Sequence, residues 1–347
     1  MTVFVALLGL IFLIVIHELG HMLTAKALGV RVPEFGVGFG PALVKKKIGK
    51  TVYSFRIILL GGFAKMAGMG DGAEGRDTYY AKALWRRALI ILAGPVANLL
   101  AAVAILAFVY MFQGVVTDMK PVVSAVEQGS MAQEVGIRRG DRIVGLDGGT
   151  VKTWEGFERQ MSGREVGEKV SVTVVRDGSQ KTFEGELGAD PEDKDSALVG
   201  VRPQLETTTY GPVKSVWLAV QRCAVITVKL GVFVGQLVTG EKDLYKNVTG
   251  PVGIASVGST AVNQGFFLPL LALISLNLAL FNLFPILPLD GGHLFFIGAE
   301  KVLGRPVSEQ TMGKIAAFGL VLVLALFLFA TYADLSKIFT GKPFIPD

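Results

Sequence analysis

The stretch Thr2–Ala25 reads TVFVALLGLIFLIVIHELGHMLTA and is almost entirely apolar. An α-helix rises about 1.5 Å per residue, so this run is long enough to cross the ~30 Å hydrocarbon core of a bilayer. It lacks a basic segment at its start, and a carboxylate with two histidines would serve no purpose inside a signal peptide. We therefore expect it to persist as a spanning helix.

The composition agrees with a membrane protein. Of the 347 residues, 51% are hydrophobic and 18% are charged, and the mean hydropathy is +0.52, which excludes an ordinary soluble domain. The single Cys223 excludes an internal disulfide or a cysteine-rich metal site, so any metal must be held by histidine and carboxylate. The net charge is +5, but no basic stripe interleaved with aromatics is present, and we expect no nucleic-acid partner.

Further apolar runs predict three more spanning helices, at about residues 88–112, 266–289 and 315–332. The segment Lys214–Val238 is also apolar enough to span, but its polar residues recur about seven apart and line one helical face. This pattern favours an amphipathic helix in the membrane interface. The expected fold is a polytopic α-helical membrane protein with four transmembrane helices.

The charges of the connecting segments predict the orientation. Residues 26–87 hold twelve Lys and Arg against four acids, whereas residues 113–265 hold seventeen against nineteen. By the positive-inside rule the first loop is cytoplasmic, so the N-terminus and the middle segment are extracytoplasmic. The expected location is the inner membrane of a bacterium.

The middle segment is expected to fold as a separate module. Apolar and polar residues alternate there in short strands, and Asp177-Gly178 is typical of a tight hairpin turn. The stretch from Ser130 to Gly148 resembles the bacterial form of the PDZ family. We therefore expect one inserted extracytoplasmic PDZ domain (α+β) within a four-part chain, whose ranges are 1–114 (membrane domain), 115–205 (PDZ domain), 206–264 (interfacial helix and linker) and 265–347 (membrane domain).

The polar interruption of the first helix has the pattern His-Glu-x-x-His. Because His17 and His21 are four residues apart, they project from one helical face and can hold one metal ion, and two imidazoles suit Zn²⁺. Glu18 is placed to accept a proton from the attacking water. An ionisable residue at mid-membrane costs about 2.5–3.5 kcal/mol on insertion scales, which indicates function. The alternative is that the three polar residues simply pack against other spans.

A third ligand is expected at the end of the third apolar run. Asp290 is the first acid after Asp243, and it lies at the same membrane depth as His17 if Lys214–Val238 does not cross. The alternative is an ordinary helix-ending Asp-Gly turn in water. Asn277 and Asn282 precede Asp290, with Asn282 two helical turns before it if the helix continues.

The cytoplasmic loop carries a hairpin pattern. Two alternating strands at about residues 42–45 and 51–57 flank Gly49-Lys50, and glycines and aromatics surround them. We expect a membrane-associated β-hairpin whose edge pairs with an extended substrate, with Gly61 and Gly62 allowing close approach of the substrate backbone. An ordinary cytosolic hairpin is the alternative.

Taken together, His17–His21, the run from Asn282 to Gly291 (NLFPILPLDG) and the module between the second and third spans resemble the site-2 protease family of intramembrane zinc metalloproteases, in particular the regulator of sigma-E protease group. The resemblance implies one zinc per chain on His17, His21 and Asp290, Glu18 as the catalytic base, and substrate binding by Asn277 and Asn282. It also implies substrates that are membrane-bound regulators, such as anti-sigma factors already trimmed by another protease.

The predicted function is therefore zinc-dependent cleavage of transmembrane segments in regulated intramembrane proteolysis. The expected partners are single-span membrane proteins and the lipid bilayer. The PDZ module either captures the C-terminus of a trimmed substrate or excludes bulky ectodomains. A non-catalytic, membrane-anchored PDZ scaffold and a metal transporter are the two alternatives.

Overall fold

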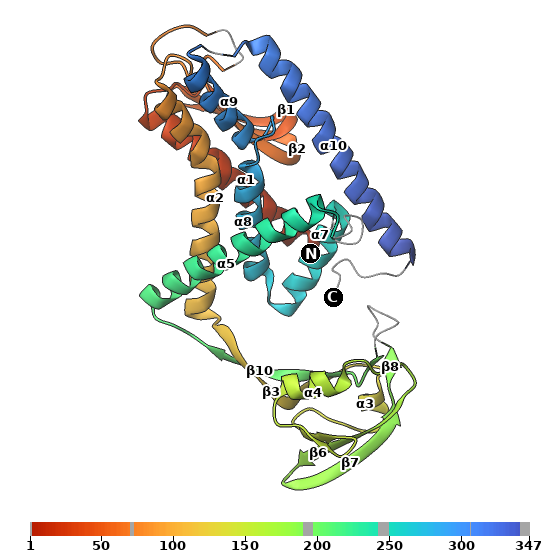
Figure 1. Ribbon diagram of the computed structural model, residues 1–347. Helices are drawn as coiled ribbons and strands as arrows, with labels where there is room; N and C mark the ends of the chain where they lie inside the picture. Colours follow the sequence, from red (N-terminus) through yellow and green to blue (C-terminus); the bar gives the residue numbers. More distant parts are fainter. Residues whose placement is uncertain (1, 70–72, 190–196, 242–249, 306, 341–347) are drawn as a thin grey trace. The chain divides into compact units, whose positions relative to one another are not determined.

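A computed structural model describes residues 2–69, 73–189, 197–241, 250–305 and 307–340 (Figure 1). The chain divides into two units, of which one contains the chain up to Val109 together with Pro212–Leu335 and the other contains mainly Tyr110–Gly211. Within the predicted ranges 115–205, 206–264 and 265–347, residues 190–196, 242–249, 306 and 341–347 lie outside the described residues.

Four helices of the described chain are long and apolar enough to cross a membrane, judged by length and composition. They are α1 (Thr2–Ala27), α2 (Leu84–Phe112), α5 (Pro212–Val238) and α10 (Glu309–Thr340). Three of them contain the spans predicted near residues 2–25, 88–112 and 315–332. The fourth, α5, is the segment predicted to lie in the interface.

The predicted continuous span at 266–289 is wrong in its second half. Helix α8 (Phe267–Asn282) has only 16 residues, and a non-helical segment leads from it to α9 (Asp290–Leu303). Proline lacks the N–H that a helix requires, and Pro285 and Pro288 both fall in this segment. Asn282 is therefore the last residue of α8 and does not continue helically towards Asp290.

Two glycines allow this segment to fold back on the start of α9. A Cβ atom on Gly291 would lie 2.2 Å from the Leu283 carbonyl oxygen, and one on Gly292 would lie 2.5 Å from the Leu287 nitrogen. Both distances are far below a van der Waals contact, so only glycine permits this backbone approach. The close backbone approach at Gly291 and Gly292 thus fixes the position of Asp290.

Helices α1 and α8 run in the same direction. A Cβ atom on Gly9, near the start of α1, would lie 2.8 Å from Phe267 at the start of α8. At the other end, His17 of α1 contacts Asp290, which follows α8 in the chain. Helix α7 (Pro251–Gln264) also packs on α1. The buried Asp334 of α10 accepts hydrogen bonds from two backbone N–H groups at the start of α7, those of Gly250, which precedes the helix (2.9 Å), and Gly253 (2.8 Å).

The loop after α1 forms the predicted hairpin, as strands β1 (Glu34–Ile48) and β2 (Thr51–Lys65). Residues 34–37 of β1 pair with residues 52–55 of β2 on one side and with residues 62–65 of β2 on the other. Residues 51–56 also pair, on their other side, with residues 42–48 of β1. Residues 62–65 therefore form one edge of this small sheet and residues 42–48 form the opposite edge. Large apolar side chains are exposed on the hairpin, namely Phe39, Leu43, Val44, Ile48, Phe55, Ile57 and Ile58.

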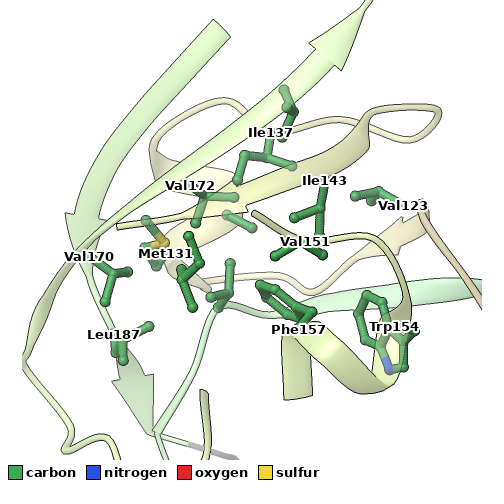
Figure 2. Close-up of a cluster of buried hydrophobic side chains, with 14 residues drawn as sticks. Val123, Met131, Ile137, Ile143, Val151, Trp154, Phe157, Val170, Val172 and Leu187 are labelled. Carbon is green, nitrogen blue, oxygen red and sulfur yellow. The ribbon is translucent and has the colours of Figure 1, made fainter. Parts of the chain in front are cut away.

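The second unit is a small α+β module with its own apolar core (Figure 2). Its elements are β3 (Val115–Val126), α3 (Met131–Glu134), β4 (Arg142–Leu146), β5 (Gly149–Thr150), α4 (Trp154–Met161), β6 (Lys169–Arg176), β7 (Ser179–Glu186), β8 (Gly188–Ala189), β9 (Ala197–Leu198) and β10 (Val201–Thr208). The main sheet has the order β10-β3-β4-β6-β7, with β5 paired to β4, and β8 pairs with β9. Trp154 and Phe157 of α4 belong to the same apolar core as Val123, Ile143 and Val172 (Figure 2).

A buried ion pair joins two parts of this module. The Asp141 carboxylate is only 1% exposed and accepts hydrogen bonds from Arg176 Nε (2.7 Å) and NH2 (2.6 Å) and from the Arg138 backbone N–H (2.8 Å). The Arg176 guanidinium holds the pKa of Asp141 below its ordinary value, although burial acts in the opposite direction. This carboxylate therefore stabilises the module above the pKa of an unfolded aspartate, and its contribution is lost as the pH falls through the lower folded pKa.

We expect Asp141→Asn to destabilise the module by about 3 kcal/mol, because it leaves Arg176 half-buried without its charged partner. Hydrogen exchange of the β4 and β6 amides in the full chain would measure the loss. Asp177→Asn makes the same chemical change at an exposed neighbouring position and should leave exchange unchanged. Equal protection in the wild type and in Asp141→Asn would refute a stabilising role for the pair.

Candidate metal centre

Two histidines of α1 and the first residue of α9 bring their side chains together. Asp290 Oδ2 lies 3.1 Å from His17 Nε2 and 3.3 Å from His21 Nε2, and the two Nε2 atoms are 3.2 Å apart. Both histidines are more than 90% buried. The structure thus brings together the three residues that the sequence predicts as metal ligands, although His21 and Asp290 are 269 positions apart along the chain.

The donor atoms suit a zinc ion in their spacing and chemistry. In a tetrahedral site with bonds of about 2.0–2.1 Å, any two ligand atoms are about 3.3–3.4 Å apart. The three distances here are 3.1–3.3 Å, close to that value. Asp290 Oδ2 is also buried, and among the described residues no donor meets it with hydrogen-bond geometry, although both imidazole Nε2 atoms are near. Such a state is costly, and a bound cation would relieve it. One zinc, with Asp290 and Glu18 ionised and both imidazoles neutral, gives a formal charge of zero.

One face of α2 completes the surroundings of the two histidines. His21 Nδ1 donates to the Ile90 carbonyl at 2.8 Å, so its Nε2 lone pair is available to a metal. A Cβ atom on Gly94 would lie 2.2 Å from His21 Nε2 and 2.8 Å from His17 Nε2, so the glycine leaves room where a metal would stand. Four residues further along the same face, the fully buried Asn98 contacts His17 Nδ1 at 3.2 Å.

The sequence reasoning missed Gly94 and Asn98, but a signal was present. Asn98 is the only amide or charged side chain within the apolar run 88–112. A buried polar side chain in a spanning helix faces the protein interior and marks a functional position. Its spacing of four residues from Gly94 then places both on one face.

The predicted base contacts the edge of the hairpin. Glu18 follows His17 on α1, and its carboxylate lies near the Ala64 backbone N–H of β2. A Cβ atom on Gly62 would lie only 3.0 Å from Glu18 Cγ, and one on Gly61 would lie 2.3 Å from the Phe39 ring. Gly62 is therefore beside the base, whereas Gly61 faces the aromatic side chain of the opposite strand.

The predicted asparagines and the third histidine lie around this centre. The Asn282 side chain donates to the Leu278 carbonyl of its own helix at 3.0 Å, and Asn277 is half-buried on α8. His293 is half-buried one turn after Asp290 and lies outside the group of three donors. It lines a small pocket with Tyr79, Arg87 and Glu300.

An ion pair fixes α9 against α2. Arg87 NH1 lies 2.9 Å from Glu300 Oε2, and the Arg87 guanidinium also lies over the Tyr79 and Tyr80 rings, 5.1 and 4.8 Å from their centroids. Arg87 is only 6% exposed. Because α9 begins at Asp290, this contact helps to hold the third donor in register with the helix that carries Gly94 and Asn98.

The chain matches known proteins over nearly its whole length. The model of peptidase family M50 matches residues 5–326. The predicted zinc metalloprotease mll0638 of Mesorhizobium japonicum is 33% identical, over 92% of this chain and 94% of its own length. CA_C1796 of Clostridium acetobutylicum, with the same description, is 32% identical (96% and 97%), and the zinc metalloprotease RasP of Geobacillus kaustophilus is 28% identical (94% and 96%).

Among solved structures, the PDZ domain of the SdrC-like protein of Listeria monocytogenes is similar to 24% of this chain and covers 84% of its own length, with 22% identity and a TM-score of 0.22. The family match and the long relatives confirm the predicted class, a zinc metalloprotease of the site-2 protease type. The chain therefore belongs to peptidase family M50.

Proposed function

We propose that this protein uses His17, His21 and Asp290 to hold one zinc ion and uses Glu18 as the base to hydrolyse peptide bonds in or beside membrane-spanning segments of other proteins. The observation that carries the proposal is that a carboxylate oxygen of Asp290 and the Nε2 atoms of His17 and His21 lie within 3.3 Å of one another. The two histidines belong to α1, a helix long and apolar enough to cross a bilayer. A base directly beside the first ligand distinguishes hydrolysis from simple metal binding.

The chain's own residues account for the proton transfers. Zinc, when bound, supplies a Lewis acid that polarises the scissile carbonyl and makes water nucleophilic near neutral pH. Glu18 accepts the proton of the attacking water and delivers it to the leaving amine nitrogen. The Ala64 N–H lies near the Glu18 carboxylate and can orient it, and the apolar surroundings of α1 exclude bulk water from the reaction.

The hairpin edge is suited to present the substrate as a strand. Peptide bonds in a helix are hidden by internal hydrogen bonds, so a substrate must be extended before cleavage. Residues 62–65 form the sheet edge, and Gly62 and Ala64 of this edge lie beside Glu18. An extended peptide added at this edge would therefore run beside the base. Asn282 and Asn277, on the neighbouring α8, are proposed to bond its backbone and steady the developing oxyanion.

The direction of the helices supports the proposed topology. Because α1 and α8 run the same way, an odd number of crossings must separate them, and α2 supplies one. This favours α5 in the interface, and in Figure 1 α5 runs across the direction of α2. The N-terminus and the 115–205 module would then be extracytoplasmic and the hairpin cytoplasmic, in the inner membrane of a bacterium.

The 115–205 module is proposed to be a PDZ domain that selects substrates, either by binding a trimmed C-terminus or by excluding intact ectodomains. The proposed substrates are single-span regulators such as anti-sigma factors. Deleting the module would lower cleavage of trimmed substrates in the first case and permit cleavage of untrimmed ones in the second.

The proposal can be tested with the purified full chain in liposomes that contain a single-span model substrate. We expect cleavage within the span, its loss with a zinc chelator, and recovery when zinc is restored. Zinc flux across the liposome membrane without proteolysis would favour the transporter, and a protein that binds no zinc would favour the scaffold.

We expect Gly62→Val to lower the rate of cleavage by at least about tenfold, because its side chain would occupy the space between the sheet edge and Glu18. The zinc content should not change, since Gly62 does not face the three donor atoms. Ala42→Val adds bulk at the opposite sheet edge and serves as the matched control. A Gly62→Val protein with wild-type activity would exclude this edge as the substrate path.

A further inference from the structure

We propose that Asn98 is the positioning residue for the zinc-binding histidine His17, because its side-chain oxygen accepts the His17 Nδ1–H and so keeps the Nε2 lone pair directed at the metal. The inference rests on the proposed zinc site and assigns a role to a residue outside the predicted ligand set. Asn98 is 0% exposed and lies on α2, 81 positions from His17.

The two histidines need the same arrangement and receive it from different groups. A neutral imidazole carries one proton, so a metal on Nε2 requires the proton on Nδ1 and an acceptor facing it. For His21 the acceptor is the Ile90 carbonyl, at 2.8 Å from Nδ1. For His17 the group facing Nδ1 is the Asn98 side-chain amide, whose nitrogen Nδ2 is placed 3.2 Å from it.

The orientation of the amide follows from the proton on His17. If Asn98 Nδ2 donated to His17 Nδ1, the histidine proton would sit on Nε2 and point at Asp290 Oδ2 and His21 Nε2, which would block a metal. A half-turn of the amide places Oδ1 at His17 instead, so that it accepts the Nδ1–H. Among the described residues, Asn98 Oδ1 has no hydrogen-bond partner in its present position, and a half-turn would put Nδ2 there instead. Hydrogen bonding at that end of the amide therefore does not favour one orientation, and the requirement of the metal decides between them.

The main chain at Asn98 is held independently of its side chain. Ser275 of α8, which is fully buried, donates from its hydroxyl to the Asn98 carbonyl oxygen at 2.8 Å. This bond ties α2 to α8 at the level of the metal centre, and the Asn98 amide remains free to serve His17. Ser275→Ala therefore disturbs the same place in the packing without removing the acceptor for the histidine.

The test is the zinc affinity of the full chain in detergent, measured by competition with a chromophoric chelator. Asn98→Leu has nearly the same size but no acceptor, and we expect it to bind zinc about 10–100-fold more weakly. Asn98→Asp offers an acceptor oxygen in either protonation state and should bind within about threefold of the wild type. Ser275→Ala should also bind within about threefold.

The outcomes separate this role from packing and from the zinc site itself. Wild-type affinity in Asn98→Leu would overturn the proposal, as would an equal loss in Asn98→Asp and Asn98→Leu, because the side chain would then act only by its shape. If the wild type binds no stoichiometric zinc, the proposed function fails instead. If Asn98→Leu binds zinc more weakly while Asn98→Asp keeps nearly the wild-type affinity, the positioning role is supported.

Discussion

A Glu18→Gln protein should bind zinc as the wild type does and cleave a single-span substrate about 10²–10⁴-fold more slowly. The amide keeps the size of the side chain but cannot accept the proton of the attacking water, and a positioned base contributes a factor of this order. None of the three donor atoms belongs to Glu18, so the metal should remain. The measurement is the initial rate of cleavage in liposomes, with zinc content determined on the same preparation.

Zinc content makes this prediction specific. If Glu18→Gln loses both zinc and activity, Glu18 is needed for the metal site and its assignment as base is unsupported. If it retains zinc and cleaves at the wild-type rate, another group transfers the proton and the mechanism proposed here is wrong.

Gly94→Ala should abolish stoichiometric zinc binding, with a loss of affinity of about 100-fold or more. The new methyl group would lie 2.2 Å from His21 Nε2 and 2.8 Å from His17 Nε2, so it would displace the imidazoles or fill the place of the metal. Metal sites tolerate deviations of only about 0.2 Å in ligand distances. Chelator competition on the full chain would measure the effect.

A glycine of α9 provides the matched control. Gly298→Ala makes the same substitution on the helix that begins with Asp290, and a Cβ atom there would meet nothing within 4 Å. Its zinc affinity should equal that of the wild type. If Gly94→Ala binds zinc as tightly as Gly298→Ala, the metal does not lie where the three donor atoms converge.

Much of the metal centre could be predicted because its chemistry is local in sequence. The four-residue spacing of His17 and His21 places them on one helical face in any helix, and Asp290 was recognisable as an isolated acid at the end of an apolar run. The second half of the third span could not be predicted in the same way. An apolar run alone does not distinguish a spanning helix from the turns and bends that contain Pro285 and Pro288 before Asp290.

The contributions of α2 depend on tertiary packing and were therefore missed. Gly94 carries no functional group that would suggest a role in the sequence. Its role follows only from the two imidazoles that approach it in the structure. Arg87 directly precedes the apolar run 88–112, a position typical of basic residues at the membrane interface. It is nevertheless buried against Glu300, 213 positions away. Long-range pairs of this kind leave no periodic signal in one sequence.

The most direct test of the zinc site is X-ray absorption at the zinc edge, combined with metal analysis, on the full chain purified in detergent. The proposed site predicts one zinc per chain surrounded only by nitrogen and oxygen at about 2.0–2.1 Å, and no zinc in Asp290→Ala. A sulfur neighbour, or full zinc occupancy in Asp290→Ala, would contradict the assignment of His17, His21 and Asp290 as the metal centre.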